Sequence, residues 1–151
     1  MHNWYQGEHA ALSHRVHDPV VALAQIICTV QSVISRNVPP NETAVISVTQ
    51  IAAGDAINVV PERTQLQGTI RTFSPEVRER VLTRFRDVVE QTASLMECEV
   101  SVNLELMAPA VINDPEVVTR LHNGLTKAAG GYTLKSDFGT MASEDVAYFL
   151  E

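Results

Sequence analysis

The alternation of apolar and polar residues is clearest in the middle of the chain, between Thr43 and Phe73. In its second half Leu66, Gly68 and Ile70 share one side, and an Ala-Ala-Gly-Asp turn separates this half from an earlier β segment. Period-two alternation is typical of an antiparallel strand with one face on a core and the other open. Pro61 lacks an N–H for a ladder, so we expect the strand to begin after it. The open face would carry Arg63, Gln65, Gln67, Thr69 and Arg71.

Three helices begin with the same local signal, a capping side chain followed by proline. The caps are Asp18, Ser74 and Asp114, and the apolar stripes predict helices over about 19–36, 74–96 and 114–129.

The first of these helices has no charged side chain between Asp18 and Arg36, whereas a surface helix ordinarily carries charges on its outer face. It is either buried by its own chain or part of a subunit interface. Because a small domain covers only one side of a helix, we expect a homodimer through residues 19–36, with Ile26 among the outward apolar residues.

Two further segments complete the predicted sheet. Residues 97–106 alternate throughout, and Met1–Gln6 supplies a short strand. The order strand, helix, strand, strand, helix, strand predicts an α+β fold, a ferredoxin-like two-layer sandwich with a four-stranded antiparallel sheet and two helices. We assign it to residues 1–110, and a C-terminal helical appendage to residues 111–151.

The composition narrows the class of protein. Of 151 residues, 45% are hydrophobic and 19% charged, as in an ordinary soluble domain. A net charge of −7 argues against binding nucleic acid. We find no membrane-length apolar run and no leader segment, so we expect a cytoplasmic protein without a membrane partner. Cys28 and Cys98 have no metal or redox spacing, and we expect two reduced thiols on buried or half-buried faces.

His9, His14 and His17 lie close together in sequence. They indicate either a metal site or a polar loop that leads into a helix. Metal sites usually add carboxylate or thiolate ligands at defined spacings, and only Glu8 and Asp18 stand nearby. The loop is the favoured interpretation.

Several motifs carry a resemblance to a known family. GEHAALSHRVHDPVVALAQI from Gly7, INVVPERTQLQGTIRTFSPEVRERV from Ile57 and TMASEDVAYFLE from Thr140 occur in the family's order. The chain resembles the metal-dependent amidohydrolases related to hippurate hydrolase, N-acyl-amino-acid aminoacylase and plant auxin-conjugate hydrolases.

This resemblance implies a longer hydrolase that cleaves N-acyl amino acids in a catalytic domain with two divalent ions, zinc or manganese. The chain resembles the inserted lid and dimerisation domain plus the start of the returning catalytic segment. Most of the family's metal ligands and its general-base glutamate lie outside it. We therefore expect no cofactor in this chain and no activity from it alone, since the chemistry needs a metal-activated water and a carboxylate.

The resemblance also assigns site residues. His9 corresponds to a lid histidine that polarises the scissile carbonyl, often in the partner subunit, and Asn58 and Arg71 correspond to substrate contacts. Arg71 is suited to a terminal carboxylate because its guanidinium forms two parallel hydrogen bonds. The alternatives are a loop residue for His9, a turn residue for Asn58 and a surface ion pair for Arg71. His14 would then orient the His9 loop.

The sequence departs from the family pattern at Glu8, Ser13, Ser143 and Val146, where the family has glycine, proline, glycine and phenylalanine. A stand-alone, non-catalytic ferredoxin-like dimerisation or regulatory module is therefore the alternative function. A complete small enzyme built on the three histidines is a third. The acyl group and amino acid of the substrate are not specified by this segment.

Overall fold

The computed structural model describes residues 8–128, 139–142 and 145–149. The chain divides into two compact units, Met1–Leu104 and Glu105–Glu151. The strand expected at residues 1–6 and the glycine pair expected to end the third helix, Gly130 and Gly131, lie outside the described residues.

The two long helices of the first unit begin where their capping residues predict. Helix α1 spans Pro19–Asn37, and one carboxylate oxygen of Asp18 accepts hydrogen bonds from two backbone N–H groups of its first turn, at 2.8 and 3.3 Å. Helix α2 spans Pro75–Leu95, and the Ser74 hydroxyl accepts from the Val77 N–H at 3.3 Å. These caps satisfy donors that a helix leaves unpaired at its N-terminus.

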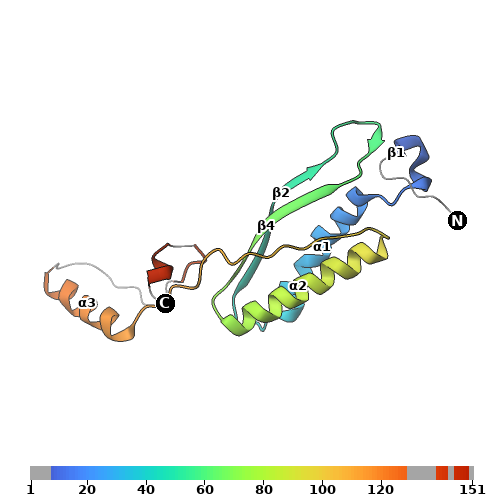
Figure 1. Cartoon of the computed structure of the whole chain (residues 1–151). Coiled ribbons are helices and arrows are strands. Elements are labelled where there is room, and N and C mark those ends of the chain that lie inside the picture. The colour runs from blue at the N-terminus through green and yellow to red at the C-terminus, as the bar shows by residue number, and fades with distance from the viewer. Residues whose placement is uncertain (1–7, 129–138, 143–144, 150–151) are drawn as a thin grey trace. The chain divides into compact units, whose positions relative to one another are not determined.

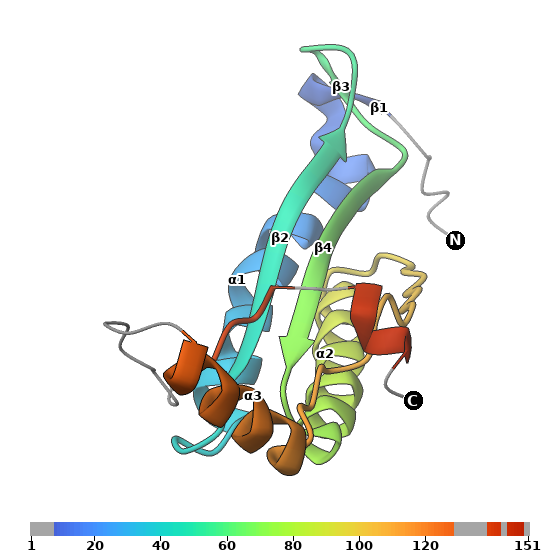
Figure 2. The same cartoon turned by 90° about the vertical axis from the view of Figure 1, so that its left-hand side faces the viewer.

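The main sheet pairs β2 (Ala44–Ala53) with β4 (Thr64–Thr72) in antiparallel register. Helices α1 and α2 pack against each other and lie on one face of this sheet, which gives two layers (Figures 1 and 2). The predicted alternation is confirmed, because Leu66 and Ile70 pack against the core while Gln65 and Gln67 are exposed.

The core of this unit lies between the helices and the sheet. Val33 on α1 and Val81 on α2 are completely buried. Around them cluster Ile26, Val30, Ile46, Val77, Val88, Val89 and Ala93.

A β-bulge interrupts the main sheet. Val48 lies opposite Gly68, but the next pair is Gln50 with Gln67, so Thr49 has no opposite residue. A Cβ atom on Gly68 would lie 2.2 Å from the Ser47 carbonyl oxygen. Only glycine permits this backbone approach, which is a recognised role of glycine in strands.

The expected four-stranded sheet is not what the described residues form. They contain two two-stranded sheets, β2 with β4, and β1 (Glu8–His9) with β3 (Val59–Val60). The α+β class is confirmed, but the strand predicted over 97–106 is wrong. That segment joins no ladder, although Val102 packs against the core and its carbonyl accepts a hydrogen bond from Arg86 at 3.3 Å. The alternation of apolar and polar residues determines which side chains face the core, but it does not provide a neighbouring strand to pair with.

Helix α1 corrects three expectations. Ile26 is buried in the core and does not face outward, whereas Cys28 is exposed and not on a buried face. No apolar run of membrane-spanning length was expected, but α1 is long and apolar enough to cross a membrane when judged by length and composition alone. One side of α1 packs against α2, β2 and β4, while only 28% of its apolar window is buried.

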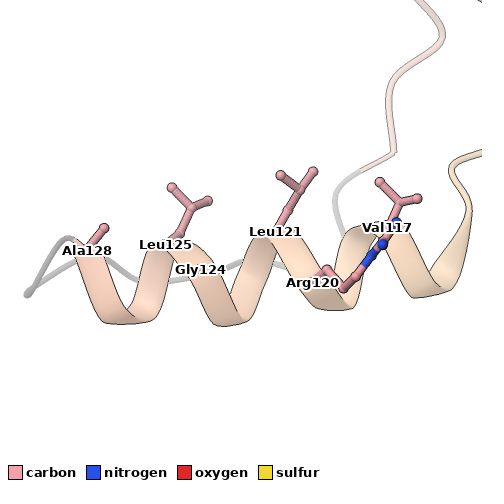
Figure 3. Close-up of a pocket in the computed structure, with 6 residues that line it drawn as sticks. All are labelled: Val117, Arg120, Leu121, Gly124, Leu125 and Ala128. Carbon is pink, nitrogen blue, oxygen red and sulfur yellow. The ribbon is translucent and has the colours of Figure 1, made fainter.

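The second unit contains α3 (Pro115–Ala128) and the short 3-10 helix η2 (Asp145–Phe149). The Asp114 carboxylate caps α3 as predicted, accepting from two backbone N–H groups at 2.8 and 2.9 Å. The side chains of Val117, Leu121 and Leu125 point to the same side of α3 and line a groove (Figure 3). All three are exposed, at 42, 61 and 51%.

Candidate functional site: the β1–β3 clamp and its histidine

Two of the three predicted site residues are brought together by a small sheet, the β1–β3 clamp. In it Glu8 lies opposite Val60 and His9 opposite Val59. The Ala10 N–H then donates to the Asn58 carbonyl at 2.9 Å. His9 and Asn58, 49 positions apart in sequence, therefore sit on adjacent backbone segments, and both are exposed.

His9 is held in a defined setting. It precedes the 3-10 helix η1 (Ala10–Arg15) as its N-cap, and its Nδ1 accepts a hydrogen bond from the Ala11 N–H at 3.2 Å. The backbone N–H of His9 itself donates to the Glu8 carboxylate at 2.9 Å. Both the ring and the backbone at this residue are fixed by local hydrogen bonds.

Arg71 lies elsewhere. It pairs with Val45 near the C-terminal end of β4. Because successive residues of a strand point to opposite faces and Ile70 packs against the core, Arg71 lies on the other face of the sheet. Arg71 comes seven positions after Thr64, and at about 3.3 Å per residue this is roughly 23 Å along the strand. Within one chain the structure brings His9 and Asn58 together but not Arg71.

The three histidines do not converge. His17 turns away to Glu97, with Nδ1 and Oε2 3.1 Å apart. Over the described ranges, no three His, Cys, Asp or Glu side chains are grouped as a metal would require. The residues here therefore do not form a donor set for the family's metal ions, and the three-histidine enzyme has no geometric support.

Sequence reasoning missed the β1–β3 clamp, the Ala11 contact and the role of Glu8. A ladder of two residue pairs is too short to produce a periodic pattern, so only the motif around Asn58 hinted at it. The helix η1 was also missed, because no proline follows its cap as in the three longer helices. Its residue Leu12 has non-helical backbone angles.

Helix α1 presents a second surface of interest. Its outward side carries Val21, Ala24, Gln25, Cys28, Gln31, Ser32 and Ser35, all exposed and uncharged. Three of the polar side chains among them donate to the helix's own carbonyls: Ser32 to Thr29 at 2.7 Å, Gln31 to Ile27 at 3.3 Å and Ser35 to Gln31 at 3.4 Å. A partner that covers this face would therefore leave few polar groups without a hydrogen-bond partner.

The fold and the clamp define a two-layer α+β domain that presents a histidine and an asparagine at one end of a long hairpin. Residues 6–97 match the peptidase dimerisation domain family of the M20 group, and the chain belongs to this family.

The chain is also similar to longer enzymes. It is 34% identical over 146 residues to the N-acetyl-L-cysteine deacetylase of Bacillus subtilis, covering 97% of the chain and 35% of that enzyme. It is 31% identical to the N-acetyldiaminopimelate deacetylase of Brevibacillus brevis, covering 97% of the chain and 39% of the enzyme. The chain thus spans little more than a third of these relatives.

Among solved structures, a putative aminohydrolase from methicillin-resistant Staphylococcus aureus superimposes with a TM-score of 0.80. The identity is 21%, and the match covers 96% of this chain and 37% of that one. This likeness supports the fold.

Proposed function

We propose that this chain is the lid and dimerisation part of a metal-dependent amidohydrolase that hydrolyses N-acyl amino acids. The observation that carries the proposal is the clamp, which holds His9 beside Asn58 in a chain of the dimerisation domain family. The deacetylase relatives support an N-acyl amino acid as substrate. Two free cysteines suit a reducing, cytoplasmic compartment.

The remaining catalytic parts belong to the rest of such an enzyme. Two divalent ions, zinc or manganese, would activate the attacking water there. Residues 111–151 would begin that part, which is supported by the boundary at Leu104 and by the exposed apolar stripe of α3. An uncovered stripe of this kind marks a face that packs against something else.

We further propose that two copies associate through α1. The outward face of this helix carries no charge between Asp18 and Arg36, and the side chains of Gln31, Ser32 and Ser35 are already bonded to its own backbone. Burying such a face costs little desolvation, because few donors or acceptors lose water without replacement.

A dimer also addresses the separation of the predicted site residues. A substrate the size of an acetylated amino acid cannot span the roughly 23 Å between the two ends of β4. His9 and Asn58 would therefore act at one substrate and the Arg71 of the same chain at another. In this scheme the site is incomplete without the second copy.

The dimer is tested by a matched pair of substitutions. Gln25 on α1 and Gln91 on α2 are both exposed. We expect Gln25→Glu to weaken dimerisation by about tenfold or more, because a charge would be buried without a partner. Gln91→Glu should leave it unchanged. Sedimentation equilibrium gives both dissociation constants, and a monomeric parent chain would contradict the proposal.

The catalytic roles are tested in a chimeric enzyme in which this chain replaces the matching segment of the Bacillus subtilis deacetylase. His9→Ala should lower kcat roughly 10²–10³-fold, as for loss of one oxyanion donor. Arg71→Lys should chiefly raise KM, because lysine cannot reproduce a two-pronged carboxylate contact. A chimera that dimerises without any turnover would favour the non-catalytic module.

A further inference from the structure

The hydrogen bond at His9 determines where its ring carries a proton. Nδ1 accepts from the Ala11 N–H at 3.2 Å. A nitrogen that accepts a hydrogen bond carries no proton of its own, and a neutral imidazole has one N–H in total. The proton of the neutral ring is therefore on Nε2.

Three consecutive backbone donors hold this arrangement. The N–H groups of residues 9, 10 and 11 bond to the Glu8 carboxylate, the Asn58 carbonyl and the His9 ring, at 2.9, 2.9 and 3.2 Å. The first bond fixes the backbone before the ring, the second ties it to the β1–β3 clamp, and the third orients the ring. The ring is exposed, so its Nε2–H is accessible to a ligand.

We propose that the Ala11 N–H is a positioning group that holds the His9 ring in the tautomer whose Nε2–H is the donor. This rests on the proposed function, in which His9 faces the carbonyl oxygen of the substrate amide. That oxygen gains negative charge as the carbon becomes tetrahedral, and a fixed donor stabilises it without reorganisation. His9 donates a hydrogen bond and keeps its proton throughout.

Glu8 has a supporting role in this scheme. Its carboxylate accepts from the backbone of the histidine, and this bond sets the direction from which the chain enters η1. The family motif has glycine at this position. The carboxylate therefore supplies a constraint that a glycine would lack.

The tautomer is measured directly on the 151-residue chain. Long-range ¹H–¹⁵N correlation spectra of the histidines, recorded with neutral rings, should show His9 Nδ1 as unprotonated and Nε2 as protonated. Ala11→Pro removes the N–H within the first turn of η1, where this donor has no partner in the helix backbone. It should produce a mixture of tautomers, whereas Ala11→Gly keeps the N–H and should retain the parent pattern. A protonated Nδ1 in the parent, or no change in Ala11→Pro, would overturn the assignment.

The role of Nε2–H is tested in the active chimera. His9→Asn keeps an oxygen near the Nδ1 position, so it can still cap η1, but it has no donor at the Nε2 position. His9→Gln loses the cap and can place an N–H₂ near Nε2. We expect kcat to fall about 10²-fold in His9→Asn and about tenfold in His9→Gln, with similar KM values.

The two levels of the proposal fail in different ways. A parent chimera without turnover would refute the proposed function, while the NMR result would still decide the tautomer. An active chimera in which His9→Asn retains as much kcat as His9→Gln would refute the role of the donor, even with the tautomer confirmed.

Discussion

Replacing Gly68 with alanine should destabilise the domain more than the same change at Gly54 or Gly124. The new Cβ would lie 2.2 Å from the Ser47 carbonyl oxygen and 3.1 Å from the Val48 Cα. Both neighbours are backbone atoms in a paired strand, so they cannot rotate away as a flexible side chain would. The strands must separate by nearly 1 Å at the bulge.

The expected cost follows from two contributions. Overpacking of this kind costs roughly 1–3 kcal/mol. Weakening one ladder hydrogen bond beside the bulge adds about 1 kcal/mol. A loss of roughly 2–4 kcal/mol is a large part of the stability of a domain this size. With a urea m-value of about 2 kcal/mol/M, the unfolding midpoint should fall by roughly 1–2 M.

Gly124→Ala is the matched control, since the same methyl group meets nothing within 4 Å there. It lies inside α3, where alanine is favoured over glycine by about 0.5–1 kcal/mol. Far-ultraviolet circular dichroism during urea unfolding should show the Gly68→Ala midpoint shifted down. Gly124→Ala should instead increase the helical signal without lowering the midpoint. If Gly68→Ala unfolds at the parent's midpoint, the close approach at the bulge is not rigid and the reasoning fails.

Three further predictions concern single side chains. Asp18→Ala should lower the free energy of unfolding by about 1 kcal/mol in the same assay, because two N–H groups of α1 lose their cap. Burial and the nearby Asp18 carboxylate raise the pKa of the Cys98 thiol, whereas Cys28 is exposed. A thiol reagent at neutral pH should therefore modify Cys28 before Cys98, because the thiolate is the reactive form. Equal rates for the two cysteines would contradict this prediction. The Ser74 hydroxyl, donating at 2.7 Å, and a backbone N–H lower the pKa of Glu76 below its usual 4.5. A carboxyl group whose pKa is lower in the folded state than in the unfolded state stabilises the fold at pH values above the unfolded-state pKa. This stabilisation is lost as the pH falls through the folded-state pKa. Stability measured below about pH 4.5 should therefore fall less steeply in Glu76→Gln.

The parts of the fold that could be predicted are those set by neighbours in sequence. Asp18, Ser74 and Asp114 each sit two or three residues before the N–H groups that they cap, so the signal and its effect share one turn. The alternation along β4 is likewise a property of the strand itself. Such features need no knowledge of the tertiary structure.

The errors arose where a distant partner decides the outcome. Residues 97–106 alternate as a strand does, yet the described backbone offers them no ladder. Ile26 and Cys28 lie on one predicted apolar helix, and only the position of α2 decides which of them is buried. The placement of His9 beside Asn58 depends on a contact between segments about 50 residues apart, which no local pattern encodes.

The brevity of the β1–β3 clamp has a consequence for local unfolding. It is held by two residue pairs, against nine in the β2–β4 ladder, and contributes no residue to the buried core. Segments with so little burial open at a small fraction of the free energy of global unfolding. The Ala10 amide should therefore exchange its hydrogen for deuterium far sooner than the amides in the middle of β4, through openings that leave the rest of the domain folded. His9 and Asn58 would separate and rejoin in each such event, while the β2–β4 ladder and the buried core stay intact.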